Sequence, residues 1–155
     1  MDTSELNKLL AEEYLYLQNV VQEFDSKAIT IKTWSVTFSL AALGGAYAVN
    51  VPLILLLAAI SALLFWLLEG YWKLFQYAYY QRTGEIEDHF AGKKALLAPM
   101  QIGRVWNKRL KTGGTKRLLR IMFRAHVALP HIIIILLGLL FFILNVANIF
   151  ILNIG

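Results

Sequence analysis

Residues 131–144 read HIIIILLGLLFFIL, and this stretch decides the fold class of the chain. Apart from His131 and Gly138 it is apolar throughout, so a helix built from it has no polar face to turn toward water. It belongs to an apolar segment that runs from Pro130 to about Ile154. A helix needs ~20 residues to cross the ~30 Å hydrocarbon core of a bilayer. The segment therefore predicts a transmembrane helix.

Two further apolar segments precede it, one from about Thr30 to Val49 and one from Pro52 to about Tyr71. The linker between them, residues 50–52, carries no charge, so the two helices are expected to form a tight hairpin. Pro52 also suits the first turn of a helix. The expected fold is an all-α integral membrane protein with three transmembrane helices, a hairpin at 30–71 and a third span at 130–155.

Composition supports this class and argues against an enzyme. Of the 155 residues 58% are hydrophobic and 16% are charged, whereas a soluble domain is roughly 45–50% apolar and about 25% charged. The absence of cysteine excludes disulfides and cysteine-based zinc sites. The three histidines are separated, and no carboxylate sits at metal-ligand spacing to two of them. No nucleotide-binding, metalloprotease or hydrolase motif is present. We expect no catalytic residue, metal site or cofactor, and we interpret His131 as an anchor at the membrane interface.

The charge distribution predicts the orientation in the membrane. Between Lys73 and His126 there are twelve Lys or Arg residues and three acids. Because basic loops stay in the cytoplasm, residues 72–129 are expected there, as an exit helix that continues the second span and a basic loop with an interfacial helix. The N-terminus is then cytoplasmic and the C-terminus lies outside.

Residues 1–29 are expected to form a cytoplasmic amphipathic helix. Its apolar residues recur at spacings of three and four: Leu6, Leu10, Tyr14, Leu17, Val21, Phe24 and Ala28. Such a helix either lies on the membrane surface or packs against another helix. Surface helices prefer Lys and Arg on the polar face, whereas this face is acidic, which favours packing. The expected partner is the basic part of the same protein or of a neighbouring copy.

The end of the basic loop reads KRLLRIMFRAHVALP, which predicts a basic amphipathic helix that leads into the third span. Its cations are Lys116, Arg117, Arg120 and Arg124. The simplest interpretation is an interfacial helix held to the anionic headgroups of the bilayer, at about 1 kcal/mol per cation. The alternative is a site for an anionic ligand or a cytoplasmic protein partner. We do not expect a nucleic acid to be the main partner.

Small and polar residues inside the spans indicate helix contacts. Gly44 and Gly45 lie in a run of small residues of the first span, which allows close packing of helices. Asn145, Asn148 and Asn153 lie with Gly138 on one broad side of the third span. Because an amide in lipid costs free energy, this side should face other helices or water. Three helices cannot enclose a pore, so a pore requires a homo-oligomer.

Glu69 is the only acid in an apolar span. About seventeen residues after Pro52, at 1.5 Å per residue, place it ~26 Å along the helix, near the cytoplasmic face. It is therefore either an intramembrane ion or proton site, or a carboxylate that snorkels toward the interface and pairs with Lys32 or Lys73.

The runs KTWSVTF (32–38) and LLFWLLEGYWKLFQYAYYQRTGEIEDHF (63–90) resemble a group of small bacterial multi-pass membrane proteins. The layout of cytoplasmic helix, tight hairpin and long exit helix is also similar to the two-span SLATT-like effector domains of bacterial anti-phage systems, and the third span is additional to that layout. The resemblance covers residues 5 to 92. It implies a location in the bacterial inner membrane and an effector that assembles and perturbs the bilayer.

Two functional hypotheses follow. The first is an oligomeric membrane pore or channel-like effector that is gated through its cytoplasmic helices. The second is a non-conducting membrane anchor or accessory subunit whose charged cytoplasmic surfaces dock a partner protein or a nucleic acid.

Overall fold

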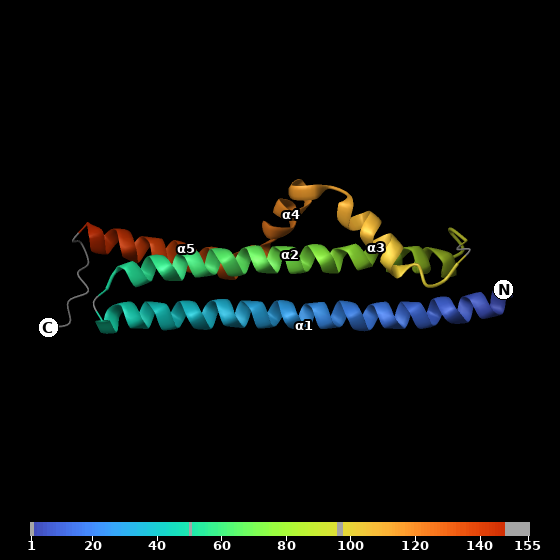
Figure 1. The fold of residues 1–155 in the computed structure, drawn as a ribbon, viewed down its shortest axis with the longest axis horizontal. Helices are drawn as coiled ribbons and strands as arrows, with labels where there is room; N and C mark the ends of the chain where they lie inside the picture. The colour runs from blue at the N-terminus through green and yellow to red at the C-terminus, as the bar shows by residue number, and fades with distance from the viewer. Residues whose placement is uncertain (1, 50, 96–97, 148–155) are drawn as a thin grey trace. The chain divides into compact units, whose positions relative to one another are not determined.

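The computed structural model describes residues 2–49, 51–95 and 98–147, and all of its regular elements are α-helices. They are α1 (Thr3–Val49), α2 (Leu53–Phe90), α3 (Ile102–Lys111), α4 (Gly114–Met122) and α5 (Ala125–Val146), which Figure 1 labels along the chain. No strand occurs within these described ranges. The expectation of an all-α protein is confirmed.

The first two helices are long because nothing in the sequence stops them. α1 joins the expected amphipathic helix and the first apolar segment into one helix of 47 residues, since its interior contains no proline. α2 continues the second apolar segment through Gly70 and Gly84 to Phe90, as expected for the exit helix. Only residues 50–52 separate the two helices, which agrees with a tight hairpin.

Two of the described helices, α2 and α5, are long and apolar enough to cross a membrane. This finding is compatible with a membrane location, and it supports two of the three expected spans. α1 does not qualify, because residues 30–49 include Lys32 and several Ser and Thr residues that lower their mean hydropathy. The third apolar segment becomes helical at Ala125, five residues before Pro130, and its expected end at Ile154 lies outside the described residues.

The chain divides into two compact units. Unit 1 consists of Met1–Lys27 and Tyr71–Leu118, and unit 2 consists of Ala28–Gly70 and Leu119–Gly155. Both α1 and α2 pass from one unit into the other.

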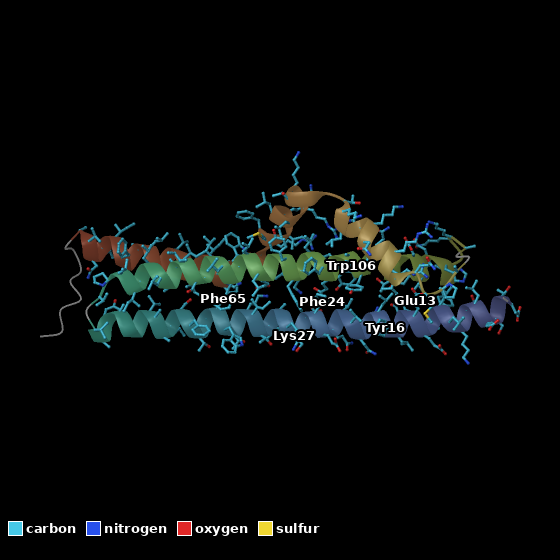
Figure 2. All side chains as sticks on the ribbon, viewed as in Figure 1. Glu13, Tyr16, Phe24, Lys27, Phe65 and Trp106 are labelled. Atoms are coloured by element: carbon cyan, nitrogen blue, oxygen red, sulfur yellow. The ribbon has the colours of Figure 1, made fainter. Side chains whose placement is uncertain are left out.

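Unit 1 is built on an antiparallel pair formed by the first half of α1 and the second half of α2. Its apolar core contains Leu10, Leu17 and Ile86, with Tyr79 and Ile102 packed against it. Figure 2 labels Phe24 on the side of α1 that faces α2, and its ring packs 4.8 Å from that of Trp72. Trp72 and Tyr79 of α2 thus pack on the first half of α1.

A buried ion pair fixes the register of these two helices. The Arg82 guanidinium donates hydrogen bonds from Nε and Nη2 to the two carboxylate oxygens of Glu13, both at 2.9 Å. The Met100 backbone N–H donates to the same carboxylate at 2.9 Å, which ties the loop before α3 to α1. Burial acts to lower the pKa of Arg82, but the hydrogen bonds and charges of Glu13 and Glu85 outweigh it and raise that pKa.

Unit 2 has an apolar exterior. Its interior contains small residues, among them Ala46, Ala58 and Ala62. Many of its large apolar side chains are exposed instead: Trp34, Phe38, Leu40, Leu57, Leu63, Leu64, Leu136, Leu140 and Ile143. Exposed apolar surface on this scale marks an interface with lipid or protein.

We predict that Arg82→Gln strongly destabilises the protein, because it leaves the buried Glu13 carboxylate without its counterion. Removing one partner of a buried pair costs about 3–5 kcal/mol. The measurement is the unfolding midpoint in mild detergent. The control is Lys93→Gln, which removes an exposed pair with Asp88 and should cost no more than about 1 kcal/mol. Equal shifts for the two variants would contradict the structural role of the Glu13–Arg82 pair.

Candidate functional site

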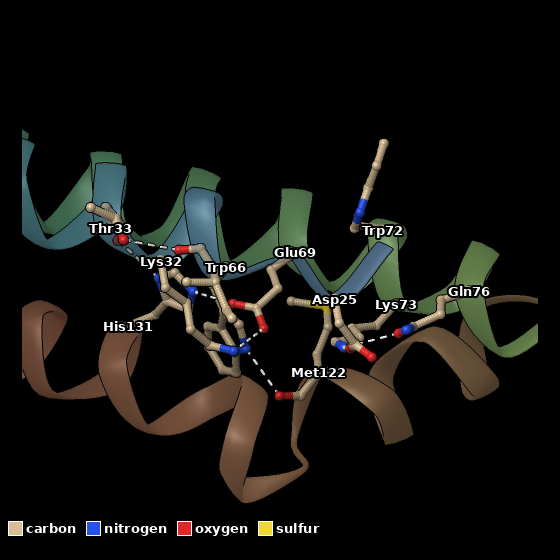
Figure 3. Close-up of polar contacts among 12 residues, drawn as sticks. Asp25, Lys32, Thr33, Trp66, Glu69, Trp72, Lys73, Gln76, Met122 and His131 are labelled. Atoms are coloured by element: carbon tan, nitrogen blue, oxygen red, sulfur yellow. Dashed lines mark hydrogen bonds and ion pairs between the residues drawn. The ribbon is translucent and has the colours of Figure 1, made fainter. Parts of the chain in front are cut away.

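Unit 2 contains a buried polar network centred on Glu69 (Figure 3). The Glu69 Oε1 atom lies 2.7 Å from the Nζ of Lys32, and its Oε2 atom lies 3.0 Å from the Nε2 of His131. The other ring nitrogen of His131, Nδ1, lies 2.9 Å from the Oγ of Ser35. Glu69, His131 and Ser35 are fully buried, and Lys32 is partly exposed.

Three helices supply these side chains. Lys32 and Ser35 are three residues apart on α1, which places them on one face of that helix. Glu69 comes from α2 and His131 from α5. One turn before Glu69, the indole Nε1 of Trp66 donates a 3.0 Å hydrogen bond to the carbonyl oxygen of Met122. This bond holds the residues that precede α5 against α2.

The carboxylate oxygens of Glu69 have different partners. Oε2 has a hydrogen-bond partner in His131, whereas Oε1 has the ammonium of Lys32 at ion-pair distance without a well-aligned hydrogen bond. Coulomb attraction depends little on the donor angle, so two opposite charges 2.7 Å apart attract each other even without an aligned hydrogen bond. Lys32 is therefore the counterion of Glu69.

The contacts constrain the tautomer of His131. An ionised Glu69 can only accept, so the Nε2 of a neutral His131 carries the proton and donates it. Nδ1 then accepts the hydroxyl hydrogen of Ser35. A further hydroxyl, Ser39 Oγ, lies one turn along α1, is buried, and has no hydrogen-bond partner within the described chain.

The outcome for the candidate residues of this network is mixed. The pairing of Glu69 with Lys32 was one of the two expectations and is confirmed, while Lys73 pairs with Asp25 at 2.6 Å instead. The interpretation of His131 as an interfacial anchor is wrong, because its side chain is buried and bonded on both ring nitrogens. Its partners Glu69 and Ser35 lie 62 and 96 positions away from it in the sequence, so no local sequence pattern predicts these contacts.

Gly138 packs against α2 of the same chain. A Cβ atom added to it would lie 2.9 Å from the backbone oxygen of Leu55 and 3.2 Å from the Cβ of Ala59. Asn145, seven residues later on α5, is half-buried. Asn148 and Asn153 lie outside the described residues.

The two glycines of the first span differ from Gly138. A Cβ added to Gly44 or Gly45 would meet nothing within 4 Å, so neither glycine is needed for close packing in the described chain.

The predicted basic residues lie in and after α4. Lys116, Arg120 and Arg124 are exposed, and Arg124 is the N-cap residue of α5. Arg117 is half-buried, and its Nη1 donates a 2.8 Å hydrogen bond to the carbonyl oxygen of Arg109. Burial and the neighbouring Arg109 lower the pKa of Arg117.

Unit 1 also carries an open apolar groove of about 440 Å³ that the sequence did not reveal. It is lined by Ala11, Tyr14, Leu15, Glu87 and Phe90. The Tyr14 hydroxyl donates to Glu87 at 2.9 Å, and this bond raises the pKa of the phenol.

The described residues contain no cluster of three or more His, Asp or Glu residues arranged to hold a metal ion. No protein family, curated protein or solved structure matches the chain. The Glu69 network, which is buried and shared by three helices, is the principal candidate site.

We predict that Gly138→Ala destabilises the packing of α5 on α2. The new methyl group would meet the α2 backbone, and overpacking of this kind costs about 1–3 kcal/mol. The matched control is Gly44→Ala, which meets open space on a helix and should not lower the unfolding midpoint in detergent. A Gly138→Ala protein as stable as the control would show that α5 does not approach α2 this closely.

Proposed function

We propose that this protein is an integral membrane protein of the bacterial inner membrane in which residues 30–49 of α1 form a third span beside α2 and α5. The support is the distribution of side chains around α1. Trp34, Phe38 and Leu40 are exposed, while Ser35 and Ser39 are buried. Ser35 and Ser39 lower the mean hydropathy of residues 30–49, although both side chains are buried inside the protein. The basic segment 72–129 supports a cytoplasmic N-terminus and an external C-terminus.

Within that membrane unit, the proposed function is that of a channel-like effector. The carrying observation is the buried Glu69–His131–Lys32 network. Ionisable side chains in apolar spans are costly and generally mark ion or proton pathways. Apolar residues could join three helices at a lower desolvation cost. A network of titratable groups therefore supports transport or gating rather than packing alone.

Three spans per chain are too few to enclose a pore, so the proposal includes a homo-oligomer. In unit 1, α1 exposes the acids Glu5, Glu12 and Glu23, and α3 exposes the bases Arg104, Lys108 and Lys111. α3 packs on α2 through Trp106, whose Nε1 donates to the Phe75 carbonyl oxygen at 3.2 Å. Figure 1 shows that α3 crosses α2, from Ile102, which packs on the core between α1 and α2, toward the side of α2 that is away from α1. This arrangement suits a ring in which the acidic side of one copy meets the basic side of the next.

Gating is proposed to act through the same two helices. α1 and α2 continue without a break from unit 1 into unit 2, and they carry Lys32 and Glu69. A partner or ligand that shifts α1 along α2 in unit 1 would change the Lys32–Glu69 contact. The ion pairs of Arg82 with Glu13 and of Lys73 with Asp25 set the resting register.

The second candidate function is a non-conducting anchor or accessory subunit. The exposed cations Lys116, Arg120 and Arg124, together with those of α3, favour it. Exposed cations of this kind attract anionic lipid headgroups or the acidic surface of a cytoplasmic partner. In this case unit 2 serves only as the membrane anchor.

We predict that Glu69→Gln lowers ion flux through liposomes that contain the purified protein by at least about tenfold, because the amide can neither pair with Lys32 nor take up a proton. Asp88→Asn is the control, since that carboxylate is paired at the surface of unit 1. Wild-type protein without measurable flux would refute the channel function and leave the anchor, whereas a Glu69→Gln protein with full flux would show that the channel does not use Glu69.

We predict that Lys108→Glu weakens self-association in mild detergent and that the added substitution Glu12→Lys restores it, because the double variant exchanges the charges across the proposed contact. The readout is the oligomer distribution by cross-linking or native mass spectrometry. Lys94→Glu changes an exposed base outside α3 and serves as the control. The proposed contact is wrong if Lys108→Glu and Lys94→Glu weaken self-association equally. It is also wrong if the double variant self-associates least of all.

A further inference from the structure

We propose that the species handled at the Glu69 site is the proton, and that Glu69, His131 and Ser35 form a proton relay between α2, α5 and α1. This inference rests on the proposed channel-like function and names the ion that the site accepts. It follows from the partners of each polar atom in the network.

The site is poorly suited to a metal cation. Na⁺, K⁺ and divalent ions require several oxygen ligands around one point. Here one carboxylate oxygen already has the Lys32 ammonium at 2.7 Å, and the other has the His131 ring at 3.0 Å. An anion is disfavoured in turn by the Glu69 carboxylate.

A proton needs no such space, because it moves along existing hydrogen bonds. The chain runs from Glu69 Oε2 through both nitrogens of His131 to Ser35 Oγ, with steps of 3.0 and 2.9 Å. Imidazole can accept a proton on one nitrogen and release one from the other, and it titrates near neutral pH in model peptides. Both ring nitrogens of His131 already have hydrogen-bond partners in the structure.

The transfer can be written with all protons accounted for. In the resting state Glu69 is ionised, Nε2 of His131 carries its proton, and Nδ1 accepts from Ser35. Ser35 Oγ passes its hydroxyl hydrogen to Nδ1 and takes a replacement from water on the side away from His131, which gives the imidazolium, in which both nitrogens donate. Transfer of the Nε2 proton to Glu69 Oε2 leaves a neutral carboxylic acid and a neutral His131 that carries its proton on Nδ1. The carboxylic acid then loses its proton to water on the partly exposed Lys32 side. Exchange of the ring proton with water, one taken up at Nε2 as the one on Nδ1 is released, restores the resting state.

Ser35 must accept a hydrogen bond from Nδ1–H in the second tautomer, so its own hydroxyl hydrogen needs a new acceptor. Ser39 lies one turn further along α1, and its buried Oγ has no partner within the described chain. It is the next oxygen on that face. Two ionisable side chains contact His131 or each other at the relay, namely Glu69 from α2 and its counterion Lys32 from α1. The ionisable residue of α5 that is nearest to His131 in the sequence is His126, which is exposed.

The test uses the full-length protein in liposomes with separate gradients of H⁺, K⁺, Na⁺ and Cl⁻. We expect the reversal potential to follow the proton gradient. His131→Gln keeps polar contacts but cannot be protonated, and it should lower proton flux at least about tenfold. Thr33→Ala, an exposed hydroxyl on the same helix, is the control and should have no effect. Circular dichroism and the unfolding midpoint confirm that each variant is folded.

The outcomes separate this inference from the channel function on which it rests. A reversal potential that follows K⁺, Na⁺ or Cl⁻, or full proton flux in His131→Gln, overturns the proton relay while a channel remains. If wild-type protein conducts nothing, the channel function fails, and the proton site is tested by ¹⁵N NMR of the His131 ring. A ring that titrates, with a midpoint that moves in Glu69→Gln, supports the site, whereas a ring that keeps one tautomer over the accessible pH range overturns it.

Discussion

The structure depends on charge that is buried between two long helices. The Glu13–Arg82 pair lies between α1 and α2 in unit 1, and the Lys32–Glu69 pair lies between them in unit 2. Such pairs contribute little net stability, because desolvation offsets most of the attraction. Their effect is on specificity. A shift of α1 along α2 by one turn would leave each buried charge without its partner, so the pairs favour the register seen in the structure.

Much of the helical architecture could be predicted from sequence, because it follows from local patterns. The three–four spacing of Leu10, Leu17 and their neighbours predicted an N-terminal helix, and the absence of a breaker after Glu69 predicted the continuation of α2. The fusion of residues 1–29 and 30–49 into one helix was not expected. A change from an amphipathic to an apolar pattern suggests a boundary, although no residue there interrupts the helical hydrogen bonds.

Only part of the candidate site could be predicted from the sequence. Counting residues along a helix placed Glu69 near a membrane face and named Lys32 as a partner, and that contact exists. His131 was missed because its partners come from two other helices, and the order in which α5 packs on them is a tertiary property. Gly138 was correctly placed at a helix contact, but its partner is α2 of the same chain.

The Lys32–Glu69 pair also bears on biosynthesis. A lysine or a glutamate alone in a span opposes insertion by the translocon, at a cost that rises toward about 2.5–3.5 kcal/mol as the charge approaches the helix centre. Residues 30–49 are too polar on average to enter a bilayer readily, and only three residues join them to α2. Entry of the two segments together, with the ammonium already beside the carboxylate, removes most of this cost. In the proposed three-span arrangement the hairpin, rather than the single helix, is then the unit of insertion.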